Sequence, residues 1–176
     1  MSTLEELIPD PWFPFTGDIT VKALEPPVVP EPARSGETSV GCHICERPED
    51  EFVWADQDWA LQDHRDTPFP GVVLLVTREH HDSYADLPER LLTALGPMTA
   101  RVERSVLTLG GVARVHTCRW GDGSAHFHLW FMPRPLGAMQ LRGSMLPMWM
   151  DLLPTLPDEQ IDAALGRIAA AMRAGD

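Results

Sequence analysis

The stretch His126–Arg134 constrains the fold more than any other part of the sequence, because its side chains alternate with a period of two. An apolar and aromatic run of this kind is typical of a buried or half-buried β-strand. One face of the strand would be apolar, and the other would carry two imidazoles and an indole. The apolar face consists of Phe127, Leu129 and Phe131, and the other face of His126, His128 and Trp130. Two histidines in a crowded core also have a purely packing interpretation, since histidine is often partly buried.

The rest of the pattern predicts an α+β fold, in which an antiparallel sheet carries one long helix and is followed by C-terminal helices. Four more short strands are expected at residues 52–55, 59–62, 71–76 and 112–118. Two amphipathic pieces near the C-terminus, at 146–153 and 157–172, predict the further helices.

Leucine, methionine and valine at helical spacing predict the long helix between Pro88 and Leu109. Asp86 is a plausible N-terminal cap for this helix. Gly96-Pro97 should kink or split it near the middle, and Gly110-Gly111 should end it.

Composition divides the chain into three expected parts: a proline-rich N-terminal arm at 1–41, a central domain at 42–135 and a helical extension at 136–176. The prolines of the arm favour extended backbone. The arm also carries an apolar group that is unusual for a free tail, namely Trp12, Phe13 and Phe15. We expect this group to anchor the arm onto the domain or onto a partner subunit; a partly disordered tail is the alternative.

Charge and cysteine usage limit the function classes. The formal net charge of -12 opposes a nucleic-acid partner, because phosphate backbones require a basic surface, but a small phosphorylated ligand held by backbone amides is compatible with it. No apolar run approaches about 18 residues, so no membrane segment is expected. The first residues lack the basic start and apolar core of a signal peptide, and three cysteines are an odd number. We therefore expect a cytoplasmic protein whose thiols are reduced or bind a metal.

Cys42-x-x-Cys45 is the strongest candidate for a metal site. It precedes an acidic, proline-containing loop, which suits a zinc knuckle better than a redox motif. A closed structural zinc site needs two further ligands, which His80 or His81 and His126 could supply. The alternative is a pair of reduced cysteines with unrelated histidines.

His128 is the candidate for chemistry, because a neutral imidazole can attack phosphorus when its other ring nitrogen is held by a hydrogen bond. The turn just upstream, which contains Gly123 and Ser124, could offer N–H groups and a hydroxyl to a phosphate. Most turns of this kind are merely turns, however. His116 and Cys118, on the neighbouring expected strand, are interpreted as packing residues.

Four further polar residues are weaker candidates for ligand binding. Asp63 and His64 lie at an expected strand end, and Arg134 follows the paired-histidine strand. Arg142 belongs to a polar cluster in the C-terminal part and would suit a phosphate. For each of these residues a solvated surface position is the alternative.

Taken together, the motifs resemble the histidine triad (HIT) superfamily, whose members hydrolyse or transfer nucleotides through a covalent nucleotidyl-histidine. The resemblance covers about Cys42 to Pro135. It depends on Cys42-x-x-Cys45, the segment ending at His80, the long helix and His126-x-His128-x-Trp130. By this resemblance His128 would be the nucleophile. A structural zinc would take Cys42, Cys45, His80 and His126, or His81 instead of His80 if the register slips by one.

The resemblance also implies that Asp63 holds the ribose and that two copies pair as a homodimer through the long helix and a strand. The sequence departs from the family at Trp130, which stands where the third histidine belongs. The galactose-1-phosphate uridylyltransferase branch has glutamine there and still forms the covalent intermediate. An indole N–H can donate a hydrogen bond but cannot shuttle a proton, so a good leaving group would be needed.

Three functions follow from these observations. The first is a zinc-containing HIT-type nucleotide hydrolase or nucleotidyltransferase that acts on a small nucleotide, with His128 and Trp130 in its active site. The second is a catalytically weak or inactive nucleotide-binding or scaffold protein with the same fold and metal. The third, a zinc-ribbon module that binds nucleic acid, is opposed by the acidic charge balance.

Overall fold

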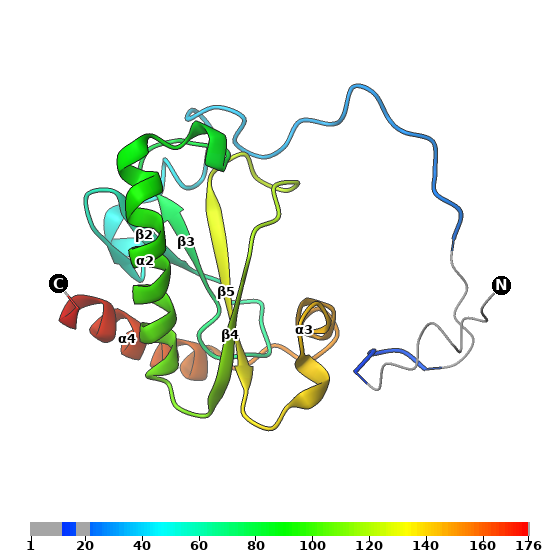
Figure 1. Ribbon diagram of the computed structural model, residues 1–176, viewed down its shortest axis with the longest axis vertical. Helices are drawn as coiled ribbons and strands as arrows, with labels where there is room; N and C mark the ends of the chain where they lie inside the picture. The colour runs from blue at the N-terminus through cyan, green and yellow to red at the C-terminus, as the bar shows by residue number, and fades with distance from the viewer. Residues whose placement is uncertain (1–11, 17–21, 176) are drawn as a thin grey trace.

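The computed structural model describes residues 12–16 and 22–175. Residues 1–11, 17–21 and 176, which include the acidic start of the expected arm, lie outside the described residues. Five strands form one antiparallel sheet in the order β1-β2-β3-β5-β4 (Figure 1). They are β1 (Trp54–Ala55), β2 (Trp59–Asp63), β3 (Val73–Thr77), β4 (Val112–Cys118) and β5 (His128–Pro135). The α+β class is therefore confirmed, and the strand bounds differ from the sequence prediction by one to two residues at most ends.

Helices follow the predicted order. They are α2 (Glu89–Leu107), α3 (Met145–Met150) and α4 (Asp158–Ala174), with the 3₁₀ turns η1 (Glu49–Glu51), η2 (Tyr84–Asp86) and η3 (Met139–Leu141). Within the described part of the chain, no helix combines the length and the apolar character that crossing a membrane requires.

Two local predictions about α2 concern its middle and its start. Of the predicted kink or split at Gly96-Pro97, the split is wrong, since the helix is continuous from Glu89 to Leu107 with Pro97 inside it. Asp86 does not cap α2, because its carboxylate accepts hydrogen bonds from the backbone N–H and hydroxyl of Ser83, at 2.9 and 2.7 Å. It thereby closes the preceding turn η2, and Pro88 takes the N-cap position of α2.

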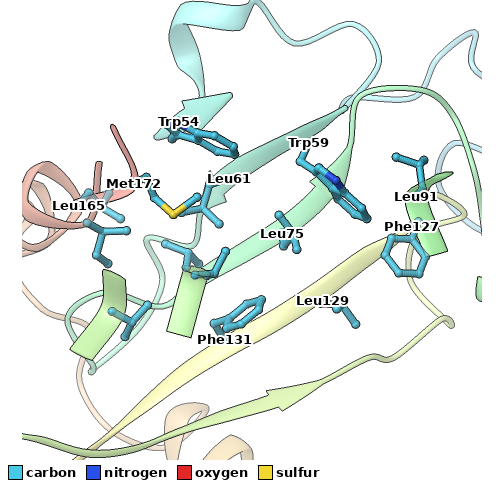
Figure 2. Close-up of a cluster of buried hydrophobic side chains, with 14 of the residues drawn as sticks. Trp54, Trp59, Leu61, Leu75, Leu91, Phe127, Leu129, Phe131, Leu165 and Met172 are labelled. Carbon is cyan, nitrogen blue, oxygen red and sulfur yellow. The ribbon is translucent and has the colours of Figure 1, made fainter. Parts of the chain in front are cut away.

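The inner face of the sheet packs against α2 and α4 and forms the main core (Figures 1 and 2). From the sheet side it receives Trp59, Leu61, Val73, Leu75, Leu129 and Phe131, together with Phe127 just ahead of β5. The helices contribute Leu91, Val102 and Val106 from α2, and Ile161, Leu165, Ile168 and Met172 from α4. The apolar alternation of β5 therefore has the buried face that the sequence predicts.

The outer face of the sheet is organised differently, since two small apolar clusters cover only its ends. At one end the Cys42–Cys45 knuckle packs over Ala60 and Val76. At the other end η3 and α3 pack over Val72 and Met132. A cleft remains between these two clusters on the outer face of β3 and β5.

The arm is anchored near α3 by Trp12. The indole N–H of Trp149 donates to the Trp12 carbonyl oxygen at 2.8 Å, and the Arg142 guanidinium lies 4.3 Å from the centre of the Trp12 ring. Between these residues and Arg34 the described part of the arm runs extended and exposed, away from the sheet (Figure 1). The expected anchoring of the arm onto the domain is thus observed for Trp12.

Candidate active site and metal cluster

Two cysteines and two histidines from three separate segments meet beside the outer face of the sheet. The Cys42 Sγ lies 3.3 Å from His126 Nδ1, and the Cys45 Sγ lies 3.4 Å from His80 Nδ1 and 3.6 Å from His126 Nδ1. All four ligand atoms lie within 4.8 Å of one another. A tetrahedral zinc ion holds its nitrogen and sulfur ligands roughly 3.3–3.8 Å apart, so this donor set fits zinc.

His80, and not His81, joins the cluster. The His81 carbonyl accepts the backbone N–H of Phe127 at 2.5 Å, and its ring Nε2 lies 3.6 Å from a carboxylate oxygen of Glu79. The sequence left open whether His80 or His81 joins the cluster, and the conformation of the segment after β3 selects His80.

A backbone contact fixes the orientation of His126. Its Nε2 lies 2.8 Å from the carbonyl oxygen of Thr77, which can only accept, so Nε2 carries the proton and Nδ1 presents a lone pair to the thiols. Burial lowers the pKa of His126 to about 4, which keeps the imidazole neutral. Burial also raises the pKa of the Cys45 thiol to about 11, and the neighbouring Cys42 adds to the shift. A bound cation would oppose that shift by favouring the thiolate.

Beside the cluster, a cleft of about 260 Å³ opens on the outer face of the sheet. Its floor is formed by β2, β3 and β5, one wall by the knuckle and the opposite wall by the turn after β4. The lining residues are His43, Ile44, Gln62, Leu74, Val76, Trp120, Gly123, Ser124, His126, His128 and Trp130. His126 and His128 therefore face the same side of the sheet, as the period-two pattern predicts.

His128 has the hydrogen bond that a nucleophilic imidazole requires. Its Nδ1 lies 2.7 Å from the carbonyl oxygen of His126, which can only accept. In the neutral imidazole the proton is therefore on Nδ1, and the lone pair is on Nε2. His126 therefore has two roles: its ring belongs to the metal cluster, and its backbone carbonyl fixes the tautomer of His128.

Trp130 lies in an aromatic group at the far end of the cleft. It pairs across the sheet with Leu74 on one side and Cys118 on the other. Its ring packs edge-on against His64 at 4.8 Å and against Trp120 at 5.9 Å between centroids. This end of the cleft is therefore aromatic and carries no carboxylate among its described lining residues.

No protein-family model and no curated protein matches the sequence. Solved structures match the fold. A zinc-bound histidine triad family protein from Mycobacterium smegmatis has a TM-score of 0.58 at 16% identity, over 79% of this chain and 100% of that chain. A HIT-like protein involved in cell-cycle regulation from Bartonella henselae has a TM-score of 0.58 at 16% identity, and the match covers 80% of this chain and 99% of that chain.

A third structure, the diadenosine triphosphate hydrolase of Plasmodium falciparum in complex with Cyclomarin A, gives a TM-score of 0.51 at 13% identity. It is matched over 73% of this chain and 80% of that chain. The chain has the histidine triad fold. On that HIT fold, the His126–His128 pair and the Cys2His2 cluster lie side by side, as the resemblance implies.

The structure does not bring Asp63 to the cleft of the HIT fold. Asp63 pairs with Val73, on the inner side of the sheet, and its carboxylate forms ion pairs with Arg47 at 3.0 Å and Arg65 at 3.3 Å. Because side chains alternate along β2, the preceding residue Gln62 faces outward and lines the cleft instead.

Two predicted arginines also lie elsewhere. Arg134 follows Met132 on the outer face, beyond the aromatic end of the cleft, and donates to the carbonyl oxygens of Pro135 and Ala138 at 3.4 and 3.3 Å. Arg142 packs on Trp12. Gly123 and Ser124 do line the cleft, and the Ser124 hydroxyl accepts the His126 backbone N–H at 3.4 Å.

Among the cleft residues with polar or aromatic side chains, three were missed by the sequence analysis. Gln62 could have been found by carrying the period-two count along β2, and His43 by its position inside the Cys-x-x-Cys knuckle. Trp120 had only a weak signal, since it is 42% exposed and precedes a glycine-rich turn. His116 and Cys118 lie on β4, next to the cleft. Burial lowers the pKa of the His116 imidazole and raises the pKa of the Cys118 thiol to about 11.

Proposed function

We propose that the chain is a HIT protein that cleaves or transfers a small nucleotide through a covalent intermediate on His128. The arrangement of His126 and His128 carries this proposal. One imidazole belongs to the metal cluster. The Nδ1 of its neighbour is hydrogen-bonded to a carbonyl oxygen, so the neutral ring has its lone pair on Nε2, beside the cleft.

In the proposed reaction, the lone pair on His128 Nε2 attacks the α-phosphorus of the nucleotide. The bond from phosphorus to the leaving group breaks, and the leaving group departs with that electron pair. Water or another acceptor then attacks the same phosphorus and releases its proton to the solvent, the N–P bond breaks, and His128 regains its lone pair. As the imidazole becomes positively charged during attack, the His126 carbonyl keeps accepting its Nδ1 proton.

Zinc is the metal that the donor set fits, and Cys42, Cys45, His80 and His126 would hold it. We propose that its role is structural: it would join the knuckle, the segment after β3 and the start of β5. None of the proposed chemical steps passes through the metal.

Trp130 bears on the choice of substrate. Its indole N–H can donate a hydrogen bond but transfers no proton near neutral pH. Leaving groups that depart without protonation are therefore favoured, such as a nucleoside phosphate or a polyphosphate. The likeness to a diadenosine triphosphate hydrolase supports this class of substrate. A cytoplasmic location and a homodimer formed through α2 and the edge strand β4 belong to the same proposal.

The decisive experiment is mass spectrometry of the protein mixed with diadenosine triphosphate or adenosine phosphoramidate. We expect an adenylylated species that is lost in His128→Ala, together with a fall in turnover of at least about 10³-fold, because a nucleophile has no substitute. His116→Ala is the matched control, since His116 lies on β4 and does not line the cleft. Wild-type protein with neither adduct nor turnover would contradict the proposal.

Replacing Trp130 by His tests the leaving-group argument. Restoring a group that transfers protons should accelerate phosphoramidate cleavage by about 10²–10⁴-fold and diadenosine triphosphate cleavage by much less. If Trp130→His creates turnover where the wild type has none, the natural protein is a nucleotide-binding protein. Equal acceleration of both substrates would reject the leaving-group argument.

A further inference from the structure

The end of the N-terminal arm contacts the turn that forms one wall of the cleft. The backbone N–H of Ser35 donates to the Gly123 carbonyl at 3.2 Å, and the Ala125 N–H donates to the Ser35 carbonyl at 2.9 Å. These two bonds form a parallel bridge between Ser35 and Ser124. A residue far from the cleft in sequence is therefore hydrogen-bonded to its wall.

Arg34 adds a second connection to the same turn. Its guanidinium donates to the Gly121 carbonyl at 3.0 Å and binds both carboxylate oxygens of Asp82, at 3.0 and 2.6 Å. Glu37 accepts from the Arg34 backbone N–H at 3.0 Å and from its Nε at 3.3 Å. The geometry of the guanidinium is thus fixed from two sides, as expected for a bidentate Arg–carboxylate pair.

These contacts determine which way the turn presents its N–H groups. In a trans peptide the C=O and the following N–H point in opposite directions. Because Ser35 holds the Gly123 carbonyl on the arm side, the Ser124 N–H points away from the arm. Ser124 lines the cleft, and within residues 12–16 and 22–175 its N–H has no hydrogen-bond acceptor. An N–H group of this kind is suited to a phosphate oxygen.

We infer that Arg34 and Ser35 are positioning residues for the proposed reaction at His128. They hold the turn so that the Ser124 N–H binds a phosphate oxygen of the nucleotide while His128 attacks the phosphorus. Gly121 and Gly123 make this turn adaptable, so an external constraint is needed to select one arrangement. The inference rests on the proposed function, but it concerns the arm, which the His128 experiment does not test.

Ser35→Pro removes the N–H that holds the Gly123 carbonyl, and Leu24→Pro is its matched control, because Leu24 lies on the arm and is fully exposed. We expect Ser35→Pro to lower the rate of adduct formation with diadenosine triphosphate by about 10²-fold, the usual effect of misplacing one such donor. Its affinity for AMP, measured by calorimetry, should fall in parallel, and Leu24→Pro should match the wild type. Zinc content and melting temperature should stay at the wild-type values.

Arg34→Ala serves as the second variant if Ser35→Pro fails to fold, and Lys22→Ala is the control for loss of a cation from the arm. In Arg34→Ala, the amide hydrogens of residues 121–125 should exchange faster than in the wild type. Adduct formation should slow without loss of zinc. Equal rates and equal AMP affinities in the variants and their controls overturn the inference and leave the proposed function intact. A wild type that forms no adduct and binds no AMP overturns both.

Discussion

The two faces of the sheet differ in what holds them together, although both are built from the same strands. On the inner face, β5 contributes Leu129 and Phe131 to a continuous apolar core with α2 and α4. On the outer face, the alternating neighbours His128 and Trp130 line a cleft between two small apolar clusters. The comparison indicates that the inner face provides stability by burial, whereas the outer face depends on a few directed contacts.

The Cys2His2 cluster is the main directed contact of the outer face. It joins the knuckle to the segment after β3 and to the start of β5, which are separated by long stretches of sequence. The apolar cluster under the knuckle is small. On this face a bound metal ion would therefore contribute the stability that the burial of apolar side chains contributes on the inner face.

The largest expected effect comes from Cys42→Ser, which removes one ligand of that cluster. We expect zinc content to fall from about one per chain to near zero. The free energy of unfolding should fall by more than about 5 kcal/mol, because structural zinc contributes about 10–16 kcal/mol in isolated zinc fingers. Metal analysis and denaturant unfolding measure both quantities. Cys118 lies outside the cluster, so the control variant Cys118→Ser should keep its zinc. A Cys42→Ser variant that stays stable and binds zinc would contradict the structural role of the metal.

An intermediate effect is expected from a pair of aromatic substitutions that separates the two faces. Phe131 is fully buried on the inner face, so Phe131→Ala should cost about 3–5 kcal/mol of stability without changing the AMP affinity of the folded protein. Trp120 is 42% exposed at the cleft, so Trp120→Ala should cost less than about 1 kcal/mol but weaken AMP binding. Unfolding curves and calorimetry on both variants test the comparison, and the reverse pattern would contradict it.

The smallest expected effect concerns the end of β2, where Gln62 and Asp63 face opposite sides. Gln62→Ala should weaken AMP binding by about 5-fold, the value of one hydrogen bond of about 1 kcal/mol. Asp63→Asn should leave AMP affinity unchanged and reduce stability by about 1 kcal/mol or less, since its ion pairs with Arg47 and Arg65 are only partly buried. If Asp63→Asn weakened binding more than Gln62→Ala, the assignment of faces would be wrong.

Local patterns made most of the fold predictable. Period-two alternation identified the two faces of β5, and helical spacing identified α2 even though Pro97 lies within it. The same alternation placed His128 beside His126, and the Cys-x-x-Cys spacing identified two of the four cluster residues. These features depend on neighbours within a few positions, where backbone geometry fixes the direction of each side chain.

Only the tertiary structure decided which residues from distant segments meet at the site. The sequence by itself determined the strands, the long helix, the knuckle and the histidine pair. The packing of the whole chain selected His80 over His81, brought Gln62 rather than Asp63 to the cleft, and set Arg34 and Ser35 against the turn at Gly123. The physical reason is that a spacing rule gives the direction of a side chain along one element. Which atoms it meets depends on how loops and strands far apart in sequence are brought together by packing and hydrogen bonding.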